Sequence, residues 1–272
     1  MQQEIELERK PTGKRKIDLD DAANIALFLA IFLGVWQLAF MSGIWPKVSL
    51  PSPESVGETF VKLIANSSLI RGIGVTLWRL GAAFAISISI GLVTGIAMVK
   101  FRGFGRTVNS FSAGLLAFPS IAWVPFSILL IGFNDFGIMF VVIMSSVFSV
   151  MISTYSSIRN VPPMYLRAAR NMGAKGVRLF WHVMLPAATP SLIIGVRQAW
   201  SFAWHAIIGA EILMSLVGLG FLLNMGRDLI DMSQVIAIMI TVFAMGLLFD
   251  RLLLLKLEER VRSKWGLAHH GE

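Results

Sequence analysis

Cysteine is absent from this 272-residue chain. Its absence excludes disulfide bonds, thiolate nucleophiles and metal sites built on cysteine ligands. The four histidines, His182, His205, His269 and His270, are too scattered along the sequence for a convincing metal site. We therefore expect no metal centre.

Charged residues are also scarce, at 15% of the chain, whereas a soluble domain carries about 25%. Hydrophobic residues reach 56% and the mean hydropathy is +0.72, which is more apolar surface than a soluble core can bury. A lipid bilayer can accept that surface, so the composition predicts an integral membrane protein. It excludes a self-contained soluble enzyme and a single-span receptor. The net charge of +8 is better explained by basic residues at the cytoplasmic membrane face than by nucleic-acid binding.

Six apolar stretches are long enough to cross a bilayer as helices. They lie at about 25–44, 73–99, 108–131, 136–155, 190–214 and 235–255. The sequence thus predicts a cytoplasmic tail at 1–24, a transmembrane domain at 25–255 and a second cytoplasmic tail at 256–272. A signal peptide is the alternative for the first stretch, but the stretch is too long for one and lacks a small-residue cleavage site.

Lysine and arginine gather in alternate connecting segments. The rich segments are the amino-terminal tail, the turn after residue 100, the loop at 158–188 and the residues from Arg251 onward. Because basic residues collect on the cytoplasmic side, this bias places both termini in the cytoplasm. We predict an all-α membrane protein with six transmembrane helices.

The loop at 158–188 is too long to be a simple turn. Pro162 and Pro163 favour a helix start, and Gly173 favours a reversal of the backbone where that helix ends. Four side chains recur at helical spacing on one face: Tyr165, Ala168, Ala169 and Met172. Such a short helix either inserts into a groove on a partner protein or lies flat on the lipid interface. The spacing alone leaves both open.

The loop and its continuation hold a recognisable series: Ala168, Ala169, Gly173, Leu185, Pro186, Pro190, Gly195 and Arg197. Other motifs are Leu50-Pro51-Ser52-Pro53, the segment 118–125, Ala210-Glu211 and Asp250-Arg251. The first series resembles the EAA loop of binding-protein-dependent ABC importer permeases. The other motifs resemble the nitrate, sulfonate, taurine and bicarbonate branch of that family. The resemblance covers about 50–265, and the order and spacing of the motifs make it specific.

The resemblance implies a type I ABC importer permease in the bacterial inner membrane. Two copies would form the membrane pathway, and two cytoplasmic ATPase subunits, which bind ATP and Mg, would each receive one EAA loop. A periplasmic or lipid-anchored binding protein would deliver the solute. The docking residues would be Tyr165, Leu166, Arg167, Ala168, Ala169, Arg170, Met172, Gly173 and Ala174. The sequence has no P-loop motif to cradle ATP phosphates, so the chain is expected to need an ATPase partner and to be no enzyme itself.

Two positions depart from the pattern of the family. The usual leading glutamate of the loop is Arg167 here, so an acidic contact with the ATPase at that position is lost or reversed. Asp135 stands where the branch favours glutamate, which is a milder change.

Ionisable residues within membrane spans are costly and indicate function. Glu211, near the outer end of the fifth span, either gates a pathway or pairs with Arg79 of the second span. Arg197, near the inner end of the fifth span, is expected to snorkel or to bind loop carbonyls. His205 either lines the pathway or is a buried residue with its hydrogen bonds satisfied.

Two further helices offer candidate pathway residues. In the third span Pro119 and Pro125 permit a kink, with Trp123 between them as a wall of the pathway or a packing residue. In the fourth span Ser149 belongs to a serine stripe that either follows the pathway or forms interhelical hydrogen bonds. The candidate pathway set is Pro119, Trp123, Ser149, Arg197, His205 and Glu211.

Three other classes of membrane protein deserve comparison. A secondary transporter would need ion-coupling carboxylates in mid-membrane, where only Glu211 offers itself. A channel would not need the long basic loop, and a membrane-embedded enzyme would need clustered acid–base residues. The branch suggests a small anion as the solute, although the external binding protein would supply most of the specificity.

Overall fold

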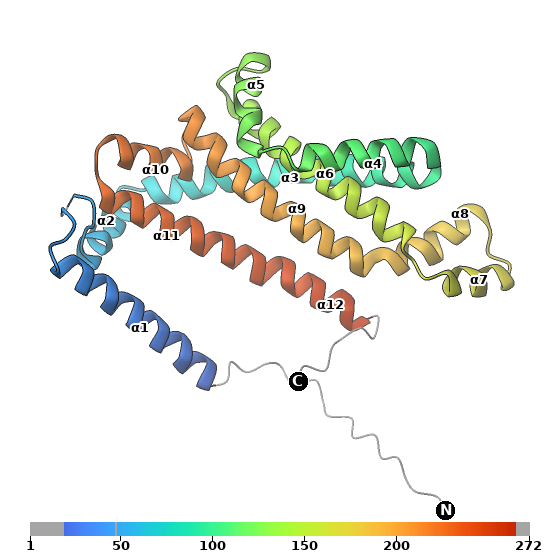
Figure 1. Cartoon of the computed structure of the whole chain (residues 1–272), viewed down its shortest axis with the longest axis horizontal. Coiled ribbons are helices and arrows are strands. Elements are labelled where there is room, and N and C mark those ends of the chain that lie inside the picture. The colour runs from blue at the N-terminus through green and yellow to red at the C-terminus, as the bar shows by residue number, and fades with distance from the viewer. Residues whose placement is uncertain (1–18, 47, 265–272) are drawn as a thin grey trace, which may run out of the picture.

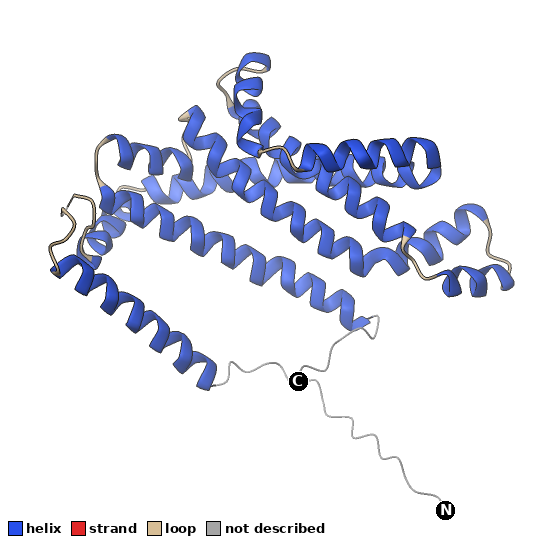
Figure 2. Ribbon diagram, viewed as in Figure 1, coloured by secondary structure: helices blue, strands red, loops and turns tan. Residues whose placement is uncertain are grey.

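The computed structural model describes residues 19–46 and 48–264, and within them the regular secondary structure is entirely helical. The elements are α1 (Leu19–Met41), α2 (Pro53–Ala65), α3 (Ser68–Lys100), α4 (Arg102–Leu116), η1 (Ser120–Ala122), α5 (Trp123–Leu130), α6 (Asp135–Arg159), α7 (Pro163–Asn171), α8 (Gly176–Leu179), the π-helical η2 (Phe180–Met184), α9 (Leu185–Met214), α10 (Leu219–Asp228), α11 (Met232–Phe249), the π-helical η3 (Asp250–Leu255) and α12 (Lys256–Lys264). Figure 2 shows that loop backbone is confined to short connections between these helices.

Within residues 19–46 and 48–264, five helical runs are long and apolar enough to cross a membrane. They are Ala23–Met41, Ser68–Lys100, Asp135–Arg159, Gly176–Met214 and Met232–Val261. These runs correspond to the first, second, fourth, fifth and sixth predicted spans, and most of them extend beyond the predicted bounds.

The third predicted span, 108–131, is not one continuous helix, and the kink that its prolines permit is a sharp break. Helix α4 ends at Leu116, and the run that begins at Ser120 is bent away from it by 92°. Pro119 lies at the break, where its ring excludes a backbone N–H and disfavours helical geometry at Phe118. The pair forms either a broken span or a re-entrant loop. The predicted basic turn after residue 100 is also mostly helix, because only Phe101 separates α3 from α4.

The predicted tails overlap the helical region at both ends. Helix α1 begins at Leu19, within the predicted tail 1–24, and α12 continues to Lys264, within the predicted tail 256–272. Residues 1–18 and 265–272 lie outside the described part of the chain.

Helices α3, α6 and α9 pack side by side and form the core of the bundle. Glycines permit this close approach: a Cβ atom added at Gly91 of α3 would lie 2.5 Å from Cβ of Val150 on α6. One turn further, the same addition at Gly95 would lie 2.5 Å from Cβ of Thr154. Gly91 and Gly95 therefore form a packing seam of small residues between α3 and α6.

The bundle has two ends, which we name after the short helices there (Figure 1). At the α10 end, α10 packs on α9 and α11, and α2 packs on α11. At the opposite α7 end, α7 and α8 project beyond the long helices. Helix α1 stands apart, joined to α2, and Trp36 Nε1 donates a hydrogen bond of 3.0 Å to the carbonyl of Pro51.

Candidate functional site

Helix α7 is built as the sequence predicts. Pro163 occupies its first turn, where the missing N–H costs nothing. At its end Gly173 adopts φ +87°, the left-handed conformation that favours glycine. The N–H of Ala174 donates to the carbonyl of Ala169 at 2.9 Å, and that of Gly173 donates to Arg170 at 3.0 Å. These two bonds form a Schellman motif, which reverses the chain before α8.

One side of α7 packs on the bundle and the other side is exposed. Leu166 and Ala169 turn toward the bundle, where Leu166 packs on a cluster that includes Ile158 and Leu192. Of the four residues predicted to share an apolar face, Tyr165, Ala168 and Met172 are exposed, as a face that meets a partner or lipid must be, whereas Ala169 is buried. Met172 is 87% exposed, so α7 presents apolar side chains outward as well as inward.

The surface around α7 carries charge of one sign. From Arg159 to Leu185 the sequence has no Asp or Glu. The cations Arg167, Arg170, Lys175 and Arg178 are all exposed. Exposed apolar residues among basic ones suit a surface that a partner covers, and equally the headgroup region of a bilayer.

An ion cluster with a buried pair, Arg79 and Glu211, and an exposed member, Asp135, ties the helices together at the α10 end. Arg79 of α3 donates through Nη1 to Glu211 of α9 at 3.0 Å and through Nη2 to Asp135 of α6 at 2.6 Å. Glu211 is fully buried and also accepts from Thr76 Oγ1 at 2.9 Å and from the N–H of Gly220 at 3.0 Å. The predicted pair between Arg79 and Glu211 is therefore present. The sequence did not indicate that Asp135 joins it.

A second ion cluster lies toward the α7 end. Arg197 of α9 donates from Nε and Nη2 to the two carboxylate oxygens of Asp250, at 2.7 and 2.6 Å. Its Nη1 donates to Glu258 of α12 at 3.1 Å. Arg197 thus binds two carboxylates, which the π-helical η3 and α12 bring to it, and not the loop carbonyls that were expected.

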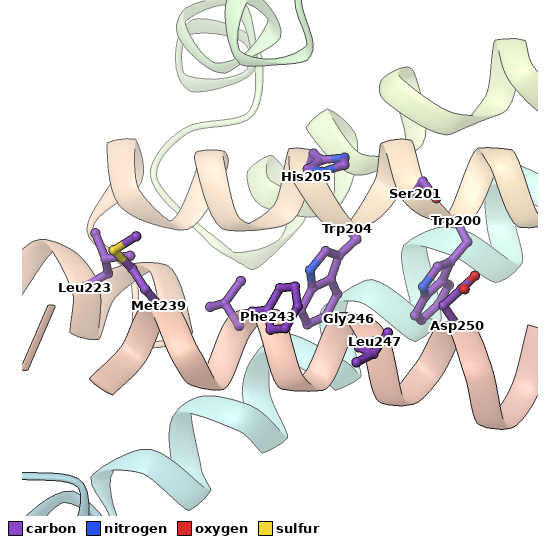
Figure 3. A pocket seen from close by; sticks show the side chains of 11 residues that line it. Trp200, Ser201, Trp204, His205, Leu223, Met239, Phe243, Gly246, Leu247 and Asp250 are labelled. Carbon is purple, nitrogen blue, oxygen red and sulfur yellow. The ribbon is translucent and has the colours of Figure 1, made fainter. Parts of the chain in front are cut away.

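The candidate pathway residues fall into separate places. Pro119 and Trp123 line a cavity of about 250 Å³ at the break between α4 and η1, together with Ser145 and Phe202. His205 is exposed and lines a larger cavity, of about 490 Å³, between α9 and α11 (Figure 3). The alternative of a buried histidine with satisfied hydrogen bonds is therefore wrong.

Ser149 lies with the packing residues. It is buried, and its neighbour along the stripe, Ser153, lies against Gly195 of α9. In the same helix Ser145 and Ser146 bond to carbonyls one turn back, and Ser146 also donates to Ser87 of α3 at 2.8 Å. Of the six candidates, only Pro119 with Trp123 are brought together at one cavity.

An all-helical bundle with five or more membrane-length helices, cavities between them and a projecting basic helix defines a polytopic membrane transport subunit. Comparison gives the particular family. The model of the binding-protein-dependent transport system inner membrane component matches residues 87–262. The chain belongs to this family, and it is a permease subunit of an ABC importer in the inner membrane.

Relatives that match most of the chain support this family assignment. The chain is 32% identical to the putative aliphatic sulfonates transport permease of Escherichia coli, over 88% of this chain and 90% of that protein. It is 31% identical to the bicarbonate transport system permease of Synechococcus elongatus, over 89% and 91%. It is 27% identical to the nitrate import permease of a Synechocystis strain, over 83% and 84%.

Solved structures support the fold. An amino acid ABC transporter matches with a TM-score of 0.63 at 17% identity, covering 74% of this chain and 98% of that one. The inward-facing MetNI methionine ABC transporter matches with a TM-score of 0.53 at 19% identity, covering 72% and 95%. Membership of the family means that an ATPase and a binding protein work with this subunit, and that it is a transport component rather than an enzyme.

Proposed function

We propose that this permease imports a small anion of the sulfonate, nitrate or bicarbonate kind, driven by ATPase subunits that dock on α7 and α8. The observation that carries the docking surface is α7 itself. It projects from the bundle, holds itself to the body through Leu166 and Ala169, and leaves Tyr165, Met172 and its arginines free for a partner. Three relatives named for sulfonate, bicarbonate and nitrate transport support the class of solute.

The orientation in the membrane follows from the position of the basic residues, and the number of spans follows from the lengths of the helices. The α7 end lies in the cytoplasm because it carries the basic loop. If α4 and η1–α5 together form one broken span, the chain crosses six times and both termini are cytoplasmic. Two copies form the pathway, two ATPases bind ATP and Mg, and an external binding protein presents the solute at the α10 end.

The ion clusters and the cavities have different parts in this scheme. Glu211 with Arg79, and Arg197 with Asp250, hold helices together within one subunit, and Ser149 lies in the packed core. Pro119, Trp123 and His205 line cavities, so they are the proposed pathway residues. ATP binding changes the spacing of the two docking helices, and the two bundles alternate between inward-facing and outward-facing states.

The docking proposal is tested by Gly173→Asp. Gly173 has φ +87° and no heavy atom within 4 Å of an added Cβ, but aspartate strains the Schellman turn and adds a negative charge among cations. We expect the variant to insert into the membrane while its ATPase no longer co-purifies. Gly103→Asp is the matched control, because Gly103 also has open space but no left-handed backbone.

Two results would contradict the proposal. One is normal co-purification and uptake by Gly173→Asp. The other is a purified permease with no nucleotide-binding partner at all, which would favour a secondary transporter or channel and make α7 a lipid-surface helix.

A further inference from the structure

The turn between α10 and α11 has the same hydrogen-bond pattern as the turn after α7. The N–H of Asp231 donates to the carbonyl of Gly226 at 2.8 Å, and that of Ile230 donates to Arg227 at 3.0 Å. These bonds form a second Schellman motif. The left-handed position, which Gly173 occupies after α7, is held here by Ile230 at φ +56°.

Isoleucine is unfavourable in that position. Its branched Cβ atom crowds the backbone at a left-handed φ, which costs free energy that glycine would not lose. In the described part of the chain the other non-glycine residues with such a φ are Ser67 and Ser215, and the hydroxyl of Ser215 accepts a hydrogen bond of 3.1 Å from Asn224. Burial does not offset the strain at Ile230, because its side chain is 73% exposed. A strained residue without a packing role is typical of a functional site.

The elements on both sides of the turn are firmly attached. Asp231 caps α11 by accepting from the N–H of Gln234 at 3.0 Å, and Gln234 Nε2 donates to the carbonyl of Leu222 on α10 at 2.7 Å. At the start of α10, the N–H of Leu219 donates to the hydroxyl of Thr76 on α3 at 2.9 Å. Because these bonds fix both flanks, the turn presents its side chains in a set arrangement, which lowers the entropic cost of binding a partner.

The turn presents an apolar pair among charged residues. Leu229 and Ile230 are 67% and 73% exposed. Arg227, Asp228 and Asp231 flank them in the sequence, and Arg227 forms a largely exposed ion pair of 2.8 Å with Asp228. An apolar centre with a polar rim is typical of a protein interface. A lipid-surface element would carry mainly lysine and arginine, whereas this turn has two carboxylates and one cation.

The position of the turn limits the choice of partner. Figure 1 shows the connection from α10 to α11 at the α10 end of the bundle, opposite to α7. In the proposed function the ATPase docks on the α7 end in the cytoplasm, so the α10 end is external. The external protein that works with a permease of this family is the solute-binding protein.

We propose that Leu229 and Ile230 are a docking contact for the external binding protein, which covers them with an apolar pocket ringed by polar groups. The contact requires an apolar side chain at the left-handed position, where glycine would have none. The inference rests on the proposed orientation and partners, and it assigns the contact to named residues.

The test uses the permease with its ATPase in lipid nanodiscs. The probe is the binding protein isolated by chemical cross-linking to the unaltered importer in whole cells. Ile230→Asn removes the apolar side chain and relieves the strain, because asparagine tolerates a left-handed backbone. We expect the midpoint of thermal unfolding to rise by about 2–4 °C, while the affinity for the binding protein falls about tenfold. A residue with only a structural role would change stability and leave the affinity unaltered.

Two further variants separate the apolar contact from the strain. Leu229→Asn removes the neighbouring apolar side chain at an ordinary right-handed backbone, so it should weaken binding without raising the unfolding midpoint. Ile44→Asn is the matched control. Ile44, between α1 and α2, is also 73% exposed but has no left-handed φ, so neither measurement should change.

Unchanged binding by Ile230→Asn, equal loss of binding by Ile44→Asn, or recovery of no binding protein would each overturn the proposal. A lipid contact has a different signature. The thiol of Ile230→Cys, which is the only one in the altered permease, would then fail to react with a water-soluble maleimide in nanodiscs. We expect it to react, and to be protected when the binding protein is added. Failure of the ATPase to co-purify with the unaltered chain would contradict the proposed function, whereas normal binding by Ile230→Asn contradicts only this inference.

Discussion

Arg79 is the residue on which the α10 end depends most. Its guanidinium meets Glu211 and Asp135 and also donates to the carbonyl of Val217 at 2.6 Å. Three helices, α3, α6 and α9, and the loop segment leading into α10 therefore meet at one buried side chain.

We predict that Arg79→Leu destabilises the protein by about 3–5 kcal/mol, because Glu211 stays buried without its cation. The midpoint of thermal unfolding in detergent should fall clearly. The double variant Arg79→Leu with Glu211→Leu should recover part of the loss, because it removes the unpaired charge. If Glu211 were a gate instead, its replacement would change transport without changing stability.

The exposed pair between Lys62 and Glu58 is the matched control. Its atoms lie 3.9 Å apart and both side chains are largely exposed. Lys62→Ala should leave the unfolding midpoint almost unchanged, since exposed ion pairs contribute little. An equal effect of the two substitutions would contradict the account of the buried cluster.

Sequence alone indicated some of these contacts and not others. Arg79 in the second span and Glu211 in the fifth predicted an ion pair, because burying either charge alone in a membrane span costs free energy. Asp135 sits in the first turn of α6, at a predicted span boundary, so nothing marked it as a partner. Asp250 is 53 positions from Arg197, and a π-helical segment that no local pattern indicated follows it.

At the scale of elements, the close packing of α3 on α6 leads to a prediction about stability. Gly91→Ala places a methyl group 2.5 Å from Val150 Cβ, so the helices must separate. We expect a lower midpoint of thermal unfolding and weaker expression in the membrane. The measurement is thermal unfolding of the purified variant.

Gly81→Ala is the control in the same helix. Nothing lies within 4 Å of a Cβ added at Gly81, and alanine favours a helix over glycine by about 1 kcal/mol. The midpoint should stay the same or rise. A fall as large as that of Gly91→Ala would contradict the packing account.

The elements were predictable where local chemistry decides them. Proline at its start and glycine after its end defined α7 correctly. The sequence did not indicate which side of α7 meets the bundle, because the contact of Leu166 with the cluster around Ile158 is tertiary. The third span shows the same limit. Its prolines indicated a kink, but the angle of that kink, 92°, depends on neighbouring helices.

For the whole molecule, the proposed orientation in the membrane can be measured by labelling single introduced cysteines. No other thiol of the chain reacts, because the natural sequence has no cysteine. Glu58→Cys lies on α2 at the α10 end, and Arg170→Cys lies on α7 at the opposite end. We expect an impermeant maleimide to label position 58 in right-side-out vesicles and position 170 only in inverted ones. The reverse pattern would invert the topology.

The two ion clusters restrict what one subunit can do when its partners move. Helix α9 is fastened to α3 and α6 near one end and to η3 and α12 further along. Its 30 residues span about 45 Å at 1.5 Å per residue. A tilt of about 10° would therefore carry the far end about 8 Å sideways by the same rise. In the proposed scheme the subunit would act as a lever arm, in which a small rotation at the ATPase would become an opening wide enough for a solute.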